Sequence, residues 1–395
     1  MMHETNKSQD NETSDAALIE SCRAVIRIPS ESGNEQKVAE LFAETMRRLA
    51  YDEVEVDGLG NVVGIIRGQG NGPNVMINGH IDHVPVGDMV DPFSAEIVDA
   101  ARWGESGLAI YGRGTCDMKS NIMAGVYAAA RMRGRPLRGD IIVVADVKEE
   151  IDSPEGVKSV IQRGITADYG ISAESTDLGV YLGHRGKLEF DVTVVGRTAH
   201  SSEPDRGLNA IFPATAFVDA IRRYAHTLPH DDLMGAATVA ITHIASSPWA
   251  NTPIIPDRCL VRIDRRYIRS ETPDDVEAEV RAVAEGVQRE HPDYRIEFSR
   301  FNHYPLMFTD PASPIVQAAL AARAAVLGER VEPGAWRFGV NGTFMVEAGI
   351  PTVGVGPGNE KWAHTPDEHV SIDQLKQVVR IYEDLLQRVC GHSPV

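Results

Sequence analysis

Two adjacent glutamates, Glu149 and Glu150, follow an apolar run at residues 141–147. Neighbouring carboxylates at the end of a buried strand repel each other and resist the loss of water unless a cation holds them there. Successive residues of a strand point to opposite sides, so one carboxylate can face a metal while the other faces a water molecule. The pair therefore indicates a metal-dependent catalytic site.

Further potential ligands share one feature, because each lies where an apolar run ends or where a loop is expected. They are His80, Asp82, Asp117, Glu174 and His364. In open α/β sheets, ligands bind at the edge formed by the carboxyl ends of the strands, so we expect these side chains to meet. Two imidazoles with several carboxylates suit Zn²⁺, with Co²⁺ or Mn²⁺ as alternatives.

The residue types also suggest a reaction. Two metals ~3.5–4 Å apart, bridged by a carboxylate, activate a shared water and polarise a carbonyl group. A carboxylate that binds no metal must then take the proton of that water and pass it to the leaving nitrogen. Glu149 is the candidate for this base. The sequence thus predicts a hydrolase that uses two metals.

The elements that position these residues follow from hydrophobic periodicity. Apolar residues at three-to-four spacing predict a helix from Asp15 that Pro29 ends, and a second helix after Asn34. Between residues 61 and 173, short apolar runs alternate with helical segments. This alternation is typical of an α/β domain with a largely parallel sheet.

A different order of elements begins after Gly186. Strand, helix, two strands, helix and strand are predicted between residues 188 and 298, which is the order of the ferredoxin-like fold. The α/β pattern then returns. We therefore expect a catalytic domain of residues 14–186 and 304–395, interrupted by an inserted domain of residues 187–303. Residues 1–13 are polar and are expected to be disordered.

The composition narrows the classes of partner and compartment. The net charge is -18, from 39 basic and 57 acidic residues, which argues against nucleic acid or an anionic membrane surface as a partner. No stretch reaches ~18 apolar residues, so no membrane span is expected, and the N-terminus lacks the pattern of a signal peptide. The four cysteines include no C-x-x-C pair, which favours the reducing cytoplasm.

Seven motifs, in order over nearly the whole chain, resemble those of one known family. They are Gly79-His-Ile-Asp-His-Val, Gly112-Arg-Gly-Thr-Cys-Asp-Met-Lys, Glu149-Glu150, Ser172-Ala-Glu-Ser, Gly196-Arg-Thr-Ala-His-Ser-Ser-Glu-Pro, Ile255-Pro-Asp-Arg-Cys with Asp264-Arg-Arg, and Ala363-His-Thr-Pro-Asp-Glu. The family is that of the acetylornithine deacetylases, succinyl-diaminopimelate desuccinylases and carboxypeptidases G, which are di-zinc metallohydrolases. The resemblance implies a zinc-peptidase-like catalytic domain with a mostly parallel sheet, and an inserted ferredoxin-like α+β domain for dimerisation that also acts as a lid.

The resemblance also implies a role for each residue of the predicted site. One metal is expected on His80 and Glu174, the other on Glu150 and His364, with Asp117 as the bridge. Glu149 is expected to be the general acid/base. Asp82 is expected to orient and polarise His80, as carboxylates behind metal-bound histidines do.

Three further residues are expected to act on the substrate. Family members are often homodimers through the inserted domain, and the histidine that matches His200 reaches the active site of the partner to stabilise the oxyanion. Arg266 matches a position associated with the substrate carboxylate, which a guanidinium can bind with two hydrogen bonds. Asn341 stands where many members carry an aspartate, and it is expected to contact the substrate.

The expected protein is a cytoplasmic, homodimeric amidohydrolase that cleaves N-acyl amino acids or small peptides through a metal-bridging hydroxide. Several alternatives stay open. His369 competes with His364 as a ligand, and one of the two metal positions can be weak. A dipeptidase or carboxypeptidase of the same family competes with a deacylase. A non-catalytic binding protein on this fold would have lost a ligand or the base, and none is missing.

Overall fold

The computed structural model describes residues 12–151, 153, 155–248 and 253–391 of the chain. The expected disorder of residues 1–13 concerns mainly residues 1–11, which lie outside the described residues. The chain divides into two compact units. The first comprises the described residues of Met1–Gly183, Phe308–Trp336 and Val340–Val395, and the second comprises His184–Met307 with Arg337–Gly339. The predicted boundaries of the inserted domain, between residues 186 and 187 and between residues 303 and 304, stay a prediction.

The first unit is built on a sheet that has nine strands among the described residues. The strands are β1 (Glu53–Val56), β2 (Val62–Ile66), β6 (Ile141–Asp146), β3 (Val75–His80), β7 (Tyr169–Ser172), β17 (Thr352–Gly354), β8 (Tyr181–His184) and β15 (Met307–Phe308), with β16 (Gly334–Trp336) paired to β8. The centre, β6-β3-β7-β17, is parallel. Antiparallel pairs flank it, with β1-β2-β6 on one side and β8 beside β17 on the other. The α/β class with a largely parallel central sheet is confirmed.

Helices cover this sheet. They are α2 (Asp15–Ile26), α3 (Gln36–Arg48), α4 (Lys119–Met132), α5 (Val157–Gln162), α8 (Pro314–Leu327), α9 (Gly342–Glu347) and α10 (Ile372–Cys390). The two helices predicted near the N-terminus correspond to α2 and α3. Ser14 and Ser371 begin α2 and α10, because each side-chain oxygen accepts a backbone N–H of the first turn.

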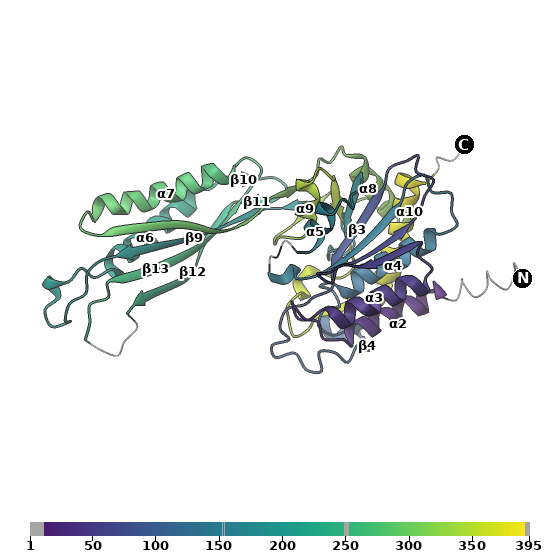
Figure 1. Cartoon of the computed structure of the whole chain (residues 1–395), viewed down its shortest axis with the longest axis horizontal. Coiled ribbons are helices and arrows are strands. Elements are labelled where there is room, and N and C mark those ends of the chain that lie inside the picture. The colour runs from purple at the N-terminus through teal and green to yellow at the C-terminus, as the bar shows by residue number, and fades with distance from the viewer. Residues whose placement is uncertain (1–11, 152, 154, 249–252, 392–395) are drawn as a thin grey trace, which may run out of the picture. The chain divides into compact units, whose positions relative to one another are not determined.

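The helix that follows Asp117 lies deep in the first unit. α4 packs against α2, α10 and β3 (Figure 1), and nearly all of its side chains are buried. Gly125 permits the close approach to the sheet, because a Cβ there would lie 2.9 Å from Cγ2 of Ile77. Met118, which follows Asp117, also packs on Gly79 near the carboxyl end of β3, because a Cβ on Gly79 would clash with its Cε.

A small antiparallel sheet of three strands was not predicted. It consists of β4 (Glu96–Asp99), β5 (Leu108–Tyr111) and β18 (His369–Ser371), with β5 in the middle. The short helical turns η1 (Ala100–Trp103) and η5 (Glu360–Trp362) lie close by in the chain. Through the β5–β18 pair, the segment that leads to Asp117 is joined to the segment that follows His364.

The second unit has the predicted ferredoxin-like order. Its strands β9 (Gly186–Val195), β12 (Thr238–Ser247), β13 (Arg258–Tyr267) and β14 (Arg295–Tyr304) form an antiparallel sheet in the order β12-β13-β9-β14. Helices α6 (Ile211–Tyr224) and α7 (Pro273–Glu290) cover one face of this sheet (Figure 1). A short hairpin, β10 (His230–Asp231) with β11 (Gly235–Ala236), precedes β12. Alternate side chains of β9 and β13 are buried under the helices, as the period-two pattern predicts.

No helix in the described parts of the chain combines the length and the apolar character needed to cross a bilayer.

Candidate metal centre

The predicted ligands come together at the carboxyl edge of the central sheet of the first unit. His80 is the last residue of β3, and Glu174 lies two residues after β7. Asp117 lies two residues before α4, and His364 lies two residues after η5. This is the edge at which parallel strands of α/β sheets present ligand sites.

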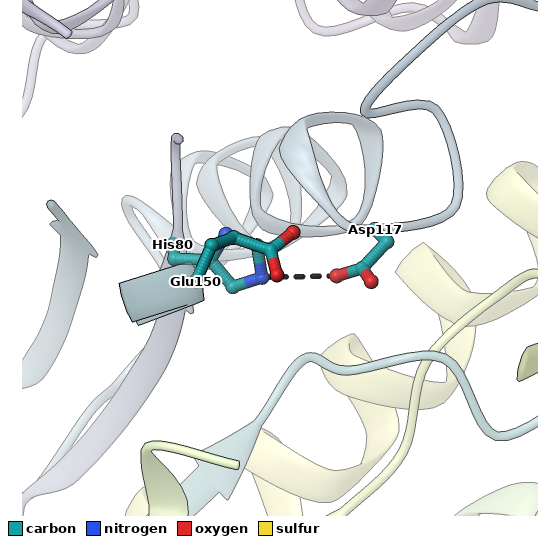
Figure 2. Close-up of side chains that lie close together, drawn as sticks. All are labelled: His80, Asp117 and Glu150. Carbon is teal, nitrogen blue, oxygen red and sulfur yellow. Dashed lines mark hydrogen bonds and ion pairs between the residues drawn. The ribbon is translucent and has the colours of Figure 1, made fainter. Parts of the chain in front are cut away.

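The side chain of Asp117 lies between the two histidines. Its Oδ1 is 3.0 Å from Nε2 of His80, and its Oδ2 is 3.0 Å from Nε2 of His364. Figure 2 shows Asp117 directed towards His80 and Glu150. One carboxylate that offers each of its oxygens to a different imidazole has the geometry of a bridging ligand.

The other two carboxylates complete a group around each histidine. Oε1 of Glu174 is 3.5 Å from Nε2 of His80, and the carboxylate oxygens of Glu150 are 3.1 and 3.2 Å from Nε2 of His364. Donors bound to one tetrahedral zinc at ~2.0–2.2 Å lie ~3.3 Å apart, so these separations suit metal coordination. One atom each of His80, Asp117 and Glu150 also lie within 4.8 Å of one another, so Glu150 is within reach of either position.

The electrostatics of this group favour a bound cation. Burial, together with the nearby charges of Asp117 and Glu150, raises the pKa of Glu174 to about 8. Burial, with the charges of Glu150 and Glu174, raises the pKa of Glu149 well above its usual range. Hydrogen bonds to Asp117 and Glu150 raise the pKa of His364 to about 11. Carboxylates crowded in a buried site need positive charge close to them, and divalent cations would supply it.

Glu149 and Glu150 are not on a strand end, which corrects the sequence prediction. Strand β6 ends at Asp146, and the two glutamates begin the 3-10 turn η2 (Glu149–Ile151). Lys148 has a φ of 60°, a left-handed conformation that ends the extended run. The side chains therefore diverge because of a turn, and not because of strand alternation.

Asp82 explains why the turn forms. Its Oδ1 accepts the backbone N–H of Glu149 at 3.1 Å, and its Oδ2 accepts that of Glu150 at 3.1 Å. Ser32 donates its hydroxyl to the same Oδ2 at 2.6 Å. Oδ1 also lies 3.4 Å from Nδ1 of His80. Asp82 thus lies behind His80, as expected, and in addition holds the two glutamates in place.

Asn341 also belongs to the first unit, and it contacts the last residue of β6. It is buried and donates its side-chain amide to Oδ2 of Asp146 at 2.7 Å. The same oxygen accepts the backbone N–H of Val157. Asn341 therefore ties the end of β6 to α5 and α9, and its predicted contact with the substrate stays a prediction.

His200 and Arg266 lie in the second unit. His200 is exposed. Its Nδ1 lies 2.7 Å from the hydroxyl of Ser202 and 3.2 Å from the backbone N–H of the same residue. The guanidinium of Arg266 makes a two-point ion pair with Asp264 at 2.8 and 3.0 Å. Their predicted roles in catalysis and substrate binding stay predictions.

Two arginines whose charges interact near Arg266, Arg185 and Arg337, were missed by the sequence interpretation. Burial and then the charges of Arg266 and Arg337 lower the pKa of Arg185. The Nε of Arg185 is buried and has no hydrogen-bond partner among the described residues. A buried donor beside like charges indicates a place for an anion. The basic run that contains Arg185 and Lys187, at the start of β9, was the available signal.

Two competing histidines are engaged elsewhere. The ring of His369 stacks on Trp103, with 3.7 Å between ring centroids, and its Nε2 lies 3.2 Å from Glu105. The Nε2 of His83 accepts the backbone N–H of Ser30, and its Nδ1 donates to the carbonyl of Val84. The structure thus brings His364, and not His369, to Asp117.

Comparisons with known proteins agree with this geometry. Residues 76–388 match the model of "Peptidase family M20/M25/M40". The chain is 31% identical to the uncharacterized protein YgeY of Escherichia coli K12, over 91% of each chain. It is 28% identical to succinyl-diaminopimelate desuccinylase 2 of a Ruegeria species, over 86% of each. The Bacillus subtilis YXEP protein, described as a dinuclear metal binding peptidase, has the same fold, with a TM-score of 0.72, 20% identity and coverage of 95% of this chain and 98% of that one.

These matches confirm the family suggested by the motifs. The family model spans most of the chain, and it includes every predicted metal ligand and Glu149. Members of this family hydrolyse amide bonds with the help of metal ions. The chain therefore belongs to peptidase family M20/M25/M40, and it is a metal-dependent hydrolase of amide bonds.

Proposed function

We propose that the protein cleaves the amide bond of an N-acyl amino acid or a small peptide that carries a free carboxylate. The observation that carries this proposal is the position of Asp117, with one carboxylate oxygen 3.0 Å from each of two histidines. The relatives named as desuccinylases act, by that name, on an N-acyl amino acid, which supports the substrate class.

Two divalent cations per chain are proposed as cofactors, with Zn²⁺ favoured and Co²⁺ or Mn²⁺ as alternatives. His80 and Glu174 would bind one cation, and Glu150 and His364 would bind the other. Asp117 would bind both cations. Bound there, the cations would supply Lewis acidity to a water and to the scissile carbonyl. The dinuclear neighbour from Bacillus subtilis supports the number of metals.

Glu149 is proposed as the general acid/base. Its Oε2 lies 3.9 Å from Nε2 of His80, so it borders the proposed ligands at a distance greater than that of a hydrogen bond. A carboxylate at this place can accept the proton of the attacking water and deliver it to the leaving nitrogen. Its raised pKa, due first to burial, favours retention of the proton between these two steps.

The substrate carboxylate is proposed to bind the basic residues of the second unit. Arg185, Arg266 and Arg337 are close enough for their charges to interact, and the Nε of Arg185 has no hydrogen-bond partner among the described residues. Asp264 already offsets the charge of Arg266, and an anion would offset the remaining positive charge and accept that hydrogen bond. The proposed group on the substrate is therefore a carboxylate, which a guanidinium binds well.

A panel of substrates tests the proposed function. Zn²⁺-loaded protein should hydrolyse N-acetyl or N-succinyl amino acids, or dipeptides, and the preference between these sets distinguishes a deacylase from a dipeptidase. Each substrate is paired with its C-terminal amide, which lacks the carboxylate. Arg185→Met should raise KM for the free acids and leave KM for the amides unchanged. No turnover of any member by protein with bound metal would contradict the proposal.

A homodimer through the second unit is proposed, with His200 acting in the site of the partner. β12 is an edge strand, and Ile244 on it is 49% exposed. An edge strand with open N–H and C=O groups is a surface on which a second copy can pair. An N–H of the His200 ring would donate a hydrogen bond to the oxyanion of the tetrahedral intermediate.

Mixing of two inactive variants tests this arrangement. In a mixed dimer, the His200→Ala subunit keeps Glu149 and the Glu149→Gln subunit keeps His200. If His200 acts across the interface, the active site of the His200→Ala subunit contains both native residues. If His200 acts within its own subunit, neither site contains both. We expect the mixture to recover part of the wild-type activity. Ile244→Asp should dissociate the dimer, and Phe212→Asp, at a more exposed position on α6, serves as the control. A monomer in solution would overturn the proposal.

A cytoplasmic location is also proposed. All four cysteines are buried and free, which is the usual state in a reducing compartment.

A further inference from the structure

We propose that Glu368, paired with Arg113, is a positioning residue that fixes the bridging carboxylate of Asp117 and couples it to the segment that carries His364. This inference rests on the proposed metal site. It assigns a function to two residues that are not among the proposed metal ligands.

Glu368 binds the backbone of the Asp117 segment directly. Its Oε1 accepts the backbone N–H groups of Cys116 and Asp117, both at 3.2 Å. Its Oε2 lies 2.5 Å from Nη1 of Arg113. Glu368 is fully buried, and Arg113 is 2% exposed. Because the carboxylate is out of water, these contacts account for its position.

The contacts of Glu368 lie between two segments that are far apart in the sequence. Glu368 follows His364 by four residues, and its backbone carbonyl accepts the N–H of Gly112 at 3.2 Å. The next residue, His369, pairs with Tyr111 in the small sheet. The segment that supplies His364 is thus joined to the segment that supplies Asp117. A shift of the first segment would move a proposed ligand of one metal, and a shift of the second would move the proposed ligand of both.

Arg113 makes this arrangement possible. The carboxylates of Glu368 and Asp117 are both buried, and their charges repel each other. The guanidinium of Arg113 binds Oε2 of Glu368 and offsets the charge of this carboxylate. Oε1 of Glu368 is then available to accept two backbone N–H groups. Arg113 is itself held, because its backbone N–H donates to the carbonyl of Pro92 at 2.8 Å. The buried amine of Lys119 donates to the carbonyl of Ile28 at 2.8 Å. Burial lowers the pKa of Lys119 to about 7, and the nearby charge of Glu368 acts against that shift.

The same type of device recurs on the other side of the site. Asp82 accepts the N–H groups of Glu149 and Glu150, as Glu368 accepts those of Cys116 and Asp117. In both cases a buried carboxylate that binds no metal orients the backbone of two consecutive residues. Carboxylates behind metal ligands typically contribute 10–100-fold to metal affinity, so an effect of about this size is expected from Glu368.

A matched control is present in the second unit. Arg265 and Glu271 form another buried Arg–Glu pair, with side-chain exposures of 0% and 9%, and Glu271 lies in a different unit from the metal ligands. Glu271→Gln therefore removes the charge of a buried pair without a direct effect on the metal site. A purely structural function of Glu368 predicts the same outcome for both substitutions.

The test compares Glu368→Gln and Glu368→Asp with Glu271→Gln and the wild type. Zn²⁺ affinity is measured by competition with a chelator, the stoichiometry by elemental analysis, and the ligand geometry by the visible absorption of the Co²⁺-loaded proteins. Glu368→Gln should weaken binding about 10–100-fold at both metal positions, because Asp117 is shared, and should change the Co²⁺ spectrum. His364→Ala, in contrast, should lose one metal only. Glu368→Asp keeps the negative charge opposite Arg113 and should recover part of the Zn²⁺ affinity. If Glu368→Gln does not fold, Glu368→Asp is measured in its place.

The possible outcomes separate this inference from the proposed function. Folded Glu368 variants with wild-type affinity and an unchanged Co²⁺ spectrum would overturn the positioning function alone. An equal loss of affinity in Glu271→Gln would overturn it as well. A wild-type protein that binds no metal would overturn both this inference and the proposed function.

Discussion

The side-chain carboxylate of Asp82 accepts the backbone N–H of Glu150 at 3.1 Å. Its other oxygen accepts the N–H of Glu149 and lies 3.4 Å from Nδ1 of His80. The backbone carbonyl of Asp82 lies closer still to Nδ1 of His80, at 3.1 Å. One buried residue thus contacts a histidine from the end of β3, and its side chain holds two glutamates of the turn after β6. Two proposed ligands of different metals, His80 and Glu150, therefore depend on Asp82 for their positions. The proposed base, Glu149, depends on it as well.

Asp82→Asn should weaken metal binding without removal of a ligand. An amide has one acceptor oxygen, so its NH₂ group must face one of the two N–H groups that the carboxylate accepts. The turn η2 then shifts, and we expect Zn²⁺ affinity to fall about 10–100-fold, measured by chelator competition. Ser32→Ala, which removes only the hydroxyl bonded to Asp82, should have a much smaller effect. Equal affinities of Asp82→Asn and the wild type would show that Asp82 does not position the site.

Glu149→Gln should abolish the proton transfer and leave the metal site intact. Loss of a general base costs about 10²–10⁴-fold in rate, and we expect kcat to fall by this order while elemental analysis finds the wild-type metal content. Glu155→Gln is the control, because Glu155 is also close in sequence but pairs with Lys148. Full activity of Glu149→Gln would mean that another group is the base.

Metal binding should release protons at neutral pH. The pKa of His364 is raised to about 11 by hydrogen bonds to Asp117 and Glu150, so the ring carries a proton at pH 7 that a metal must displace. Affinity for Zn²⁺ should therefore rise with pH. Calorimetric titrations with Zn²⁺ in buffers of different ionisation enthalpy measure the protons released. The number should fall in His364→Ala, and an unchanged number would contradict the prediction.

Asp146 should make the protein less stable as pH rises. Burial is the main cause that raises its pKa from 3.8 to about 6, and its Oδ1 has no hydrogen-bond partner among the described residues. A folded-state pKa above the unfolded value means that the contribution to stability is fully present below pH 3.8 and is lost between pH 3.8 and about 6. The difference corresponds to roughly 3 kcal/mol. Denaturant unfolding from pH 4.5 upwards should show this loss in the wild type and not in Asp146→Asn. The same pH dependence in both proteins would assign the effect to another group.

Asn341→Asp should destabilise the protein at neutral pH. The substitution places a second carboxylate at the position from which Asn341 donates to Asp146 at 2.7 Å. Two carboxylates at this distance must share a proton, so stability falls as pH rises through the raised pKa of the pair. We expect a loss of roughly 1–3 kcal/mol at pH 7, the cost of an unsatisfied buried polar group, and little loss at pH 4. A loss of the same size at both pH values would argue against the shared proton.

Local patterns in the sequence were sufficient for the main elements. The spacing of apolar residues predicted α2 and α3, and the alternation of strands and helices predicted the central sheet and the order of the second unit. The ends of apolar runs and the family motifs pointed to His80, Asp117, Glu150, Glu174 and His364, which the structure brings together. Periodicity and the position of a residue after a strand are local properties, so they can be read without the fold.

Other features depend on partners that are far away in the chain, and only the tertiary structure decided them. β18 is three residues long and has no pattern of its own, since it exists through pairing with β5. The turn at Glu149 and Glu150 forms because Asp82, 67 residues earlier than Glu149, accepts their N–H groups. Glu368 gives no signal in the sequence beyond its motif, and its contacts with Arg113 and Asp117 span about 250 residues. A buried carboxylate takes its function from the donors around it, and those donors meet only when the chain has folded.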